Sequence, residues 1–201
     1  MKNIVLIGGG GHCKSCIDVI EMEKKYKILG LVDNNIKKLV LNYKVLGTDK
    51  KIKKIYKKKL YALITIGQIT NLNMREFLFN KVHLCGFKFP RIISPLAYVS
   101  KHAKIGEGTI VMHGAIINAG AVIGKNCIIN SKSLIEHDTT IGNHCHIATG
   151  ATINGGVTVK SNCFIGSRSI IKQDLAIGKN CFLNANIFIQ KDLKDKSKIL
   201  K

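Results

Sequence analysis

The sequence predicts an α/β N-terminal domain with Rossmann-like topology, followed by an all-β domain, a left-handed parallel β-helix. In residues 1–92, apolar strand segments alternate with amphipathic helical segments, an order typical of a small parallel sheet. Within residues 93–201, an aliphatic residue recurs at every sixth position from Val99 to Ile189. That spacing fits neither the helical period of about 3.6 nor the strand period of about 2. A fixed short repeat of this kind is typical of a parallel β-helix.

Three strands are expected in the first domain, and each ends in residues that suit a binding site. The strands are expected at 3–7, 28–32 and 60–66, with helices at 13–24, 49–59 and 71–82. The first strand leads into Gly8-Gly9-Gly10-Gly11-His12, the second into Asp33-Asn34 and the third into Gly67. Parallel sheets bind ligands at the carboxyl ends of their strands, so these residues form one candidate site.

The formal net charge of +20 indicates anionic partners of some kind, such as nucleic acid, a membrane surface or a phosphorylated small molecule. The densest lysine run, 50–59, carries apolar residues at helical spacing and is interpreted as the solvated face of an amphipathic helix. No recognition-helix or RNA-binding motif accompanies it, so no nucleic-acid partner is expected. No apolar run approaches the ~20 residues of a membrane span, and the first strand lacks a signal-cleavage pattern. We therefore expect a cytoplasmic protein without a membrane partner.

The repeat itself runs without a break in phase from Val99 to Ile189, through sixteen aliphatic positions. Two residues earlier in each hexad, small residues dominate. Four of them are cysteines spaced 18 residues apart, Cys127, Cys145, Cys163 and Cys181. Three hexads make one coil, so these cysteines are expected to stack inside the prism as small apolar fillers, with no metal bound. Glycines that follow the aliphatic position are expected at corners with positive φ; they are Gly106, Gly124, Gly142, Gly166 and Gly178.

Several motifs resemble those of a known family. They are the hexads with glycine after the aliphatic residue, the opening Val5 to His12, Val32-Asp33-Asn34, Ile66-Gly67, Asn130-Ser131, Ile135-Glu136-His137-Asp138 and His146-Ile147-Ala148. Together they resemble the sugar-modifying branch of the hexapeptide-repeat acyltransferases. That branch includes bacillosamine-type nucleotide-amino-sugar N-acetyltransferases and relatives that O-acetylate sialic acid. The resemblance implies a homotrimer, acetyl-CoA in a groove between neighbouring β-helices, and a nucleotide-sugar held by the N-terminal domain.

The substrate-binding residues implied by the resemblance are Gly10, Gly11, His12, Asp33, Asn34 and Gly67. Backbone N–H groups at the start of a helix can meet a phosphate. Cys13 stands where the third glycine of a dinucleotide motif would be, which weakens a dinucleotide interpretation. The alternative is a glycine turn that only shortens a strand–helix connection.

His137 is the expected general base, because a histidine can take a proton from an attacking amine near neutral pH. Asp138 resembles the family's acidic residue that orients the imidazole, and Glu136 is the other candidate partner. The structural alternative is an exposed corner histidine without a catalytic role.

Acetyl-CoA contacts implied by the resemblance fall on His146, Gly155, Ser167 and Ala185. His146 follows His137 by half of an 18-residue coil, so the two should point to different sides of one prism. We therefore expect each site to take His137 from one subunit and His146 from its neighbour. Relatives usually end in a Gly-x-Pro-Ala-Lys type segment, whereas here the chain stops at Lys194 to Lys201. Those lysines are candidates for contacts to CoA phosphates.

The reaction expected from these residues is N-acetylation of a nucleotide-linked (UDP or GDP) 4-amino-4,6-dideoxy sugar by direct transfer, without a metal or a covalent acyl-enzyme. Two alternatives stay open. One is O-acetylation of a sialic or legionaminic-type sugar. The other is a non-catalytic trimeric hexapeptide protein.

Overall fold

The computed structural model describes residues 1–56, 60–68 and 72–201. Its N-terminal domain is a four-stranded sheet in the order β3-β2-β1-β4, and all neighbouring strands are parallel. The strands are β1 (Lys2–Ile7), β2 (Tyr26–Val32), β3 (Val45–Gly47) and β4 (Tyr61–Ile64). Helices α1 (Gly11–Glu23) and α3 (Met74–Leu84) complete the expected α/β alternation. The predicted α/β architecture of this domain is therefore confirmed.

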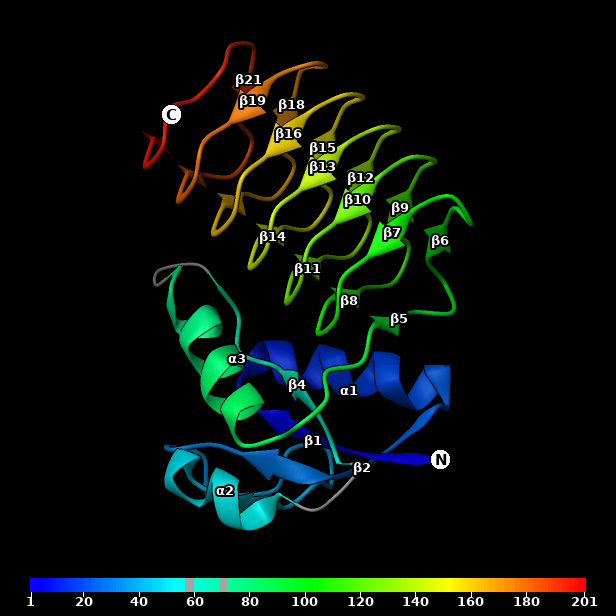
Figure 1. Cartoon of the computed structure of the whole chain (residues 1–201), viewed down its shortest axis with the longest axis vertical. Helices are drawn as coiled ribbons and strands as arrows, with labels where there is room; N and C mark the ends of the chain where they lie inside the picture. Colours follow the sequence, from blue (N-terminus) through cyan, green and yellow to red (C-terminus); the bar gives the residue numbers. More distant parts are fainter. Residues whose placement is uncertain (57–59, 69–71) are drawn as a thin grey trace.

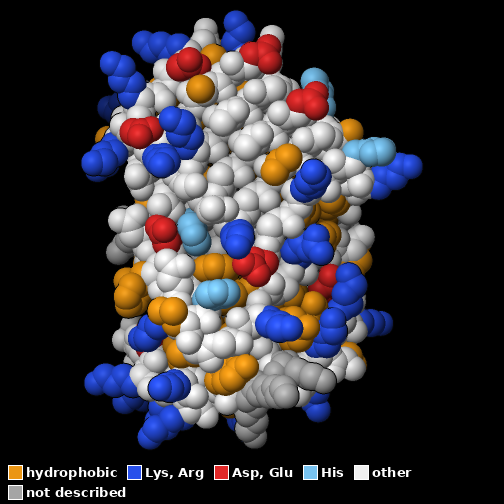
Figure 2. Space-filling view, viewed as in Figure 1, with side chains coloured by type: hydrophobic (Ala, Val, Ile, Leu, Met, Phe, Trp, Pro, Cys, Tyr) orange, Lys and Arg blue, Asp and Glu red, His pale blue; other side chains and the backbone are white. Residues whose placement is uncertain are grey.

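The basic helix expected at 49–59 is shorter in the structure. A single 3₁₀ turn, η1 (Asp49–Lys51), is followed by one turn of α-helix, α2 (Ile52–Ile55). Residues 57–59 lie outside the described residues, as do residues 69–71 before α3. Lys and Arg side chains are scattered over both domains in the view of Figure 2, with Asp and Glu side chains among them. On this face the large positive charge does not gather into a single patch.

From Ile92 onward the chain winds into a triangular prism whose three faces are parallel sheets (Figure 1). The face toward the N-terminal domain has seven strands: β5 (Ile92–Ile93), β8 (Ile110–Val111), β11 (Ile128–Ile129), β14 (His146–Ile147), β17 (Phe164–Ile165), β20 (Phe182–Leu183) and β22 (Lys198–Ile199). The next face has six: β6 (Tyr98–Val99), β9 (Ile116–Ile117), β12 (Leu134–Ile135), β15 (Thr152–Ile153), β18 (Ile170–Ile171) and β21 (Phe188–Ile189). The third has five: β7 (Lys104–Ile105), β10 (Val122–Ile123), β13 (Thr140–Ile141), β16 (Thr158–Val159) and β19 (Ala176–Ile177).

The predicted six-residue repeat sets the register of all three faces. Along each face, paired residues are 18 positions apart, as in Ile110↔Ile128 and Ile128↔His146. The last coil is shorter, because Phe182 pairs with Lys198, which is 16 rather than 18 positions further along the chain. The aliphatic positions and the small residues before them fill the prism, and Cys127, Cys145, Cys163 and Cys181 are buried free thiols in this interior.

The expectation for the glycines of the repeat is wrong. Positive φ falls three residues after the aliphatic position, at Gly108, Gly120 and Gly156 but also at Asn126 and Asp138. The glycines directly after the aliphatic position, such as Gly106, serve a different need. A Cβ on Gly106 would lie 2.6 Å from the backbone of Gly124 on the next coil. Coils stack at the ~4.8 Å spacing of paired strands, which leaves no room there for a side chain.

The two domains share a hydrophobic core. Ile92, Ile110 and Ile128, on the outer side of the seven-stranded face, are fully buried against Ile17 and Ile20 of α1. The seven-stranded face is thereby covered at its lower end. Within the described residues, the longest helices fall short of what a bilayer crossing would require.

Candidate functional site

The corner that follows β12 presents a histidine–carboxylate pair. Nδ1 of His137 lies 2.9 Å from Oδ2 of Asp138, and both side chains are largely exposed. Asp138 has a φ of 59° and so forms the left-handed corner residue of this coil, a conformation that Asp tolerates better than most residues. The hydrogen bond to Asp138 raises the pKa of His137, and the charges of Glu136 and Asp174 add to this effect. When Nδ1–H donates to the carboxylate, the neutral ring keeps its lone pair on Nε2, the atom needed for a general base.

Glu136, the other candidate partner, is held elsewhere. Its Oε2 accepts a hydrogen bond from Asn118 Nδ2 at 2.9 Å and one from the backbone N–H of His137 at 3.3 Å. Asn118 stands one coil before Glu136 on the same corner. The structure therefore pairs the imidazole with Asp138, and Glu136 contributes to the site through its charge.

Gly155 lies directly beside the imidazole, one coil above it. A Cβ on Gly155 would be 2.7 Å from both Cε1 and Nε2 of His137. Its missing side chain thus makes room for the histidine ring in the same chain. The acetyl-CoA contact expected at Gly155 stays a prediction, and this closeness places Gly155 beside His137 rather than with the other residues assigned to the cofactor.

His146 lies on β14, on the covered face of the prism, and is almost fully buried. Its Nδ1 donates to the carbonyl oxygen of Gln68 at 3.0 Å, and Asn130 Nδ2 donates to its Nε2 at 3.2 Å. Burial, opposed by the hydrogen bond to Gln68 and assisted by the charge of Arg75, lowers the pKa of His146 to about 4. His146 is therefore neutral, and its Nε2 is an acceptor only. His146 and His137 lie on different sides of the prism within one chain. This agrees with the expectation from their spacing in the sequence.

Ser167 and Ala185 share another corner, between the seven-stranded and six-stranded faces. The backbone links the coils there in series: Gly150 N–H donates to Ser131, Arg168 N–H to Thr149, and Asn186 N–H to Ser167. Ser167 and Ala185 therefore stand one above the other on successive coils, as expected for residues along one groove. This corner begins directly after His146, so three of the four residues assigned to acetyl-CoA lie on the same side of the prism.

The glycine loop between β1 and α1 is open. A Cβ added to Gly10, Gly11 or Gly67 would meet no atom of the described residues within 4 Å, and none of the three has a positive φ. Packing therefore does not explain why these positions lack side chains. Gly10 is the N-cap residue of α1, without a side-chain cap and without an acidic residue in the first turn. Free N–H groups of a helix start, next to open space, suit an anionic ligand.

Asp33, at the end of β2, is hydrogen-bonded to the glycine loop between β1 and α1. Its Oδ2 accepts the N–H of Gly9 at 2.7 Å, and its Oδ1 accepts the N–H groups of Asn35 and Ile36 at 2.8 Å. These three bonds lower the pKa of Asp33 in spite of its partial burial. Asn34 is paired with Asp49 through two bonds of 3.0 Å. Asp33 and Asn34 line a cavity of about 230 Å³ with Gly8, Asn35, Asp49 and Ile66.

His12 connects the loop to the β-helix. Its ring lies 6.5 Å from that of His146, centroid to centroid, and its Nε2 is 3.4 Å from the thiol of Cys16. Burial, with Arg75 and His146 adding to it, lowers the pKa of His12 well below its ordinary value. The structure thus brings together two groups that the sequence had assigned to different ligands, namely the substrate loop and His146.

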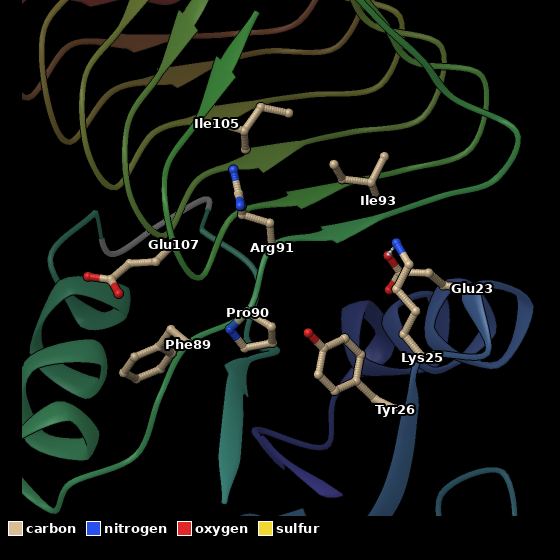
Figure 3. Close-up of a pocket in the computed structure, with 9 residues that line it drawn as sticks. All are labelled: Glu23, Lys25, Tyr26, Phe89, Pro90, Arg91, Ile93, Ile105 and Glu107. Atoms are coloured by element: carbon tan, nitrogen blue, oxygen red, sulfur yellow. Dashed lines mark hydrogen bonds and ion pairs between the residues drawn. The ribbon is translucent and has the colours of Figure 1, made fainter. Parts of the chain in front are cut away.

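A larger cavity, of about 530 Å³, lies at the opposite edge of the sheet, where the β-helix begins (Figure 3). Its lining includes Glu23 and Tyr26 from the N-terminal domain and Arg91 and Ile105 from the first coil. None of the predicted site residues lines it. The predicted residues lie elsewhere: His137, Asp138 and Gly155 at one corner, Ser167 and Ala185 at another, and His146, His12 and the glycine loop at the domain junction.

Two residues of the site were missed from the sequence, Gln68 and Asn118. Gln68 is fully buried, orients His146 through its carbonyl oxygen, and donates from Nε2 to the carbonyl oxygen of His144 at 2.8 Å. Asn118 holds Glu136. A glutamine after Gly67 or an asparagine at a corner carries no motif of its own, because the contact depends on how distant segments pack.

Family models and known structures cover the same two parts of the chain. The model of the PglD N-terminal domain matches residues 3–82. Two hexapeptide models match the β-helix: bacterial transferase hexapeptide (six repeats) at 102–137 and 120–155, and hexapeptide repeat of succinyl-transferase at 156–191. UDP-N-acetylbacillosamine N-acetyltransferase of Bacillus subtilis (strain 168) is 31% identical over 115 residues, 56% of this chain. That match spans about half of the relative's length, 52%.

Two solved structures match along nearly the whole chain. PerB from Caulobacter crescentus, in complex with CoA and GDP-perosamine, has a TM-score of 0.91 and 31% identity, covering 97% of this chain and 92% of that one. The acetyltransferase domain of PglB from Neisseria gonorrhoeae FA1090, in complex with acetyl coenzyme A, has a TM-score of 0.92 and 26% identity, covering 98% and 95%. The fold and these matches define a left-handed β-helix acyltransferase of the hexapeptide-repeat class. Within that class, the chain belongs to the sugar acetyltransferase family that includes the bacillosamine-type nucleotide-amino-sugar N-acetyltransferases.

Proposed function

We propose that this chain is an acetyl-CoA-dependent N-acetyltransferase that acts on the 4-amino group of a nucleotide-linked (UDP or GDP) 4-amino-4,6-dideoxy sugar. The observation that carries the proposal is the His137–Asp138 pair, because its hydrogen bond leaves Nε2 as the free base atom. Relatives support the substrate class, since the matched PerB structure holds GDP-perosamine and CoA. In this proposal residues 1–92 bind the nucleotide-sugar and residues 93–201 bind acetyl-CoA. A cytoplasmic location belongs to the proposal, because acetyl-CoA is supplied there.

Direct transfer accounts for the proposed reaction. The sugar amine attacks the thioester carbon while His137 Nε2 takes a proton from the nitrogen, and Asp138 stabilises the imidazolium that forms. A backbone N–H donor stabilises the developing oxyanion. The carbonyl then re-forms and the thiolate of CoA leaves. No cysteine nucleophile takes part, since the cysteines of the β-helix are buried inside the prism.

A homotrimer is part of the proposal, and the six-stranded face provides the surface for it. The outward residues of this face form a ladder that includes Tyr98, Ile116, Ile170 and Phe188, which are 59%, 40%, 42% and 56% exposed. The five-stranded face instead turns Lys104, Thr140, Thr158 and Ala176 outward together with Val122. An exposed apolar ladder of this length is typical of a protein–protein interface, and three copies with cyclic symmetry can each bury it.

The trimer would complete the active site. The six-stranded face is flanked by two corners, one carrying His137 and Gly155 and the other carrying Ser167 and Ala185. When three prisms turn this face toward a common axis, the first corner of each lies beside the second corner of its neighbour. His137 of one subunit would then face the groove of the next subunit, beside that subunit's His146 and glycine loop. This arrangement explains why His137 is so exposed in the single chain.

A substrate panel tests the proposed reaction. The full chain is incubated with acetyl-CoA and UDP- or GDP-linked 4-amino-4,6-dideoxy sugars, and the product is identified by mass spectrometry and NMR. An N-acetyl group at C4 of one nucleotide-linked sugar is the expected result. Acetylation of a hydroxyl on a free or activated nine-carbon sugar would instead establish O-acetylation, and no acetylation of any acceptor would favour the non-catalytic alternative.

Mixed trimers test the shared site. The His137→Ala chain is refolded together with a His146→Gln chain, each inactive alone. If the site takes His137 and His146 from different subunits, some mixed interfaces combine two intact side chains and activity returns. No recovery in verified mixed trimers would contradict the two-subunit site.

A further inference from the structure

Arg75 is a buried cation at the junction of the two domains, and the proposed reaction does not use it. Arg75 lies on α3 and is completely buried. Burial lowers the pKa of its guanidinium only to about 10, so it stays charged at neutral pH. Within residues 1–56, 60–68 and 72–201, none of the ion pairs involves Arg75. A buried charge without a counter-ion is costly, so its presence calls for a function.

The partners of the guanidinium come from both domains. Nη1 donates to the carbonyl oxygens of Ile64 and Ile66 at 2.8 and 2.7 Å. Nη2 donates to the carbonyl oxygen and to Oδ1 of Asn126 at 3.2 and 2.9 Å. Ile64 and Ile66 belong to the carboxyl end of β4 and lead directly into Gly67. Asn126 is a corner residue of the β-helix and is itself fully buried.

The segment that contains Ile66 and Gly67 is also bonded to the β-helix through Gln68, the residue after Gly67. Gln68 bonds to His144 and His146 of the next coil, and Asn126 Nδ2 is 2.9 Å from Nδ1 of His144. Arg75 thus bonds to the residue that precedes Gly67 and lies within electrostatic reach of both His12 and His146. In the described part of the chain its guanidinium bonds go to neutral oxygens, so no carboxylate there cancels its positive charge, and this charge acts on His12 of the glycine loop.

We propose that Arg75 is a positioning residue of the nucleotide-sugar site. It fixes the Gly67 segment against the β-helix, and its uncompensated charge favours binding of a nucleoside diphosphate group at the glycine loop. This inference rests on the proposed function. It adds a reason for the preference for a diphosphate-linked amino sugar over the same amino sugar in free form, because only the former carries a diphosphate whose negative charge Arg75 attracts.

Three variants separate the charge of Arg75 from its hydrogen bonds, and the sharpest of them keeps the arginine. Asn126→Asp places a carboxylate at the position of the Asn126 amide, so Arg75 keeps an acceptor but gains a counter-ion. Arg75→Gln removes the charge itself, and Arg75→Lys keeps it with fewer bonds. Asn162→Gly is the matched control. It removes the 2.8 Å bond from Asn162 to Glu76, another bond between the domains, at a corner of positive φ where glycine fits, and alters no charge.

Binding of UDP and of GDP to the full-length protein is measured by calorimetry at two salt concentrations, together with binding of acetyl-CoA. We expect Asn126→Asp and Arg75→Gln to weaken nucleoside diphosphate binding by roughly ten-fold or more at low salt, with a smaller loss at high salt. Acetyl-CoA binding should change little. Arg75→Lys should lose less nucleoside diphosphate affinity than Arg75→Gln, because it keeps the charge, and Asn162→Gly should stay near the wild type.

The outcomes separate the two proposals. If the wild type binds neither UDP nor GDP, the proposed function fails and this inference fails with it. If the wild type binds one of them and Asn126→Asp binds it equally well, the role of the charge is refuted while the proposed function stands. Equal losses in Arg75→Gln and Asn162→Gly would show that Arg75 only joins the domains. Should Arg75→Gln not fold, Asn126→Asp decides, because it retains the arginine.

Discussion

Oδ2 of Asp138 lies 2.9 Å from Nδ1 of His137 at an exposed corner of the β-helix, and the imidazole rests on the bare backbone of Gly155 one coil above. Adjacent residues in a chain rarely pair in this way on a strand, since their side chains point to opposite faces. Here the left-handed corner at Asp138 turns its carboxylate back toward the ring.

Replacing the base should stop the reaction. His137→Ala removes the only atom proposed to take the proton from the amine, so kcat should fall by roughly 10² to 10⁴-fold. The side chain is 66% exposed, so the fold and the assembly state should not change. Steady-state kinetics and light scattering measure both. The control is His102→Ala, an exposed histidine of the β-helix with no assigned role, and turnover by His137→Ala equal to that of this control would contradict the mechanism.

The carboxylate of Asp138 should determine the pH range in which His137 is deprotonated and active as the proposed base. Asp138 raises the pKa of His137, and a general base is active only when deprotonated, so the rate should rise with pH through this raised pKa. Asp138→Asn keeps a residue that tolerates positive φ but removes the charge. The acidic limb of the kcat profile should therefore move to lower pH, with a reduced maximal rate. An unmoved limb would mean that Asp138 does not act on the titrating group.

A methyl group beside the imidazole should displace it. Gly155→Ala would place a Cβ 2.7 Å from Nε2 and Cε1 of His137, and the exposed ring can only swing away. We expect a loss of kcat of at least ten-fold, by displacement of the base from its working position, with an unchanged unfolding temperature. A crystal structure of the variant shows whether the ring has moved. Full activity with a displaced ring would argue against His137 as the base.

The open glycines of the loop should matter for the ligand and not for the fold. Gly11 lies in the first turn of α1 with no atom near its missing side chain. Gly11→Ala should leave stability unchanged or raise it by up to about 1 kcal/mol, because alanine is the better helix former. The KM for the nucleotide-sugar should nevertheless rise, since the methyl group occupies the space proposed for the phosphate. Thermal unfolding and initial rates separate the two effects, and an unchanged KM would exclude Gly11 from the site.

The apolar ladder should hold the trimer together. Ile116 on the six-stranded face and Val122 on the five-stranded face are 40% and 41% exposed, so they form a matched pair. Ile116→Glu should dissociate the trimer and with it abolish activity, because it buries an unpaired charge in the proposed interface. Val122→Glu should have no effect on either. Sedimentation velocity gives the assembly state, and a trimer that breaks with Val122→Glu instead would place the interface on the other face.

The architecture of both domains can be predicted from local sequence patterns. Its strongest signal is local and repetitive: each hexad needs an aliphatic residue, and a small one before it, because both point into a narrow prism. A periodic pattern of this kind can be recognised in the sequence without knowing which distant residues are in contact. The strand–helix alternation of the first domain is equally local. The corner glycines were misjudged because their role concerns the neighbouring coil, 18 residues away, rather than the local φ.

Tertiary packing alone decided how the site residues are arranged. His137 and Asp138 are adjacent in sequence, and their pairing could be proposed from the motif. The orientation of His146 by Gln68, the closeness of His12 to His146, and the buried Arg75 that joins Ile66 to Asn126 all depend on how the N-terminal domain sits on the seven-stranded face. Arg75 and Ile66 are 9 residues apart, whereas the other partners are 51 to 134 residues apart, and no spacing rule links them. Their contacts arise because the two domains bury a shared apolar surface, which fixes the polar groups at its edge.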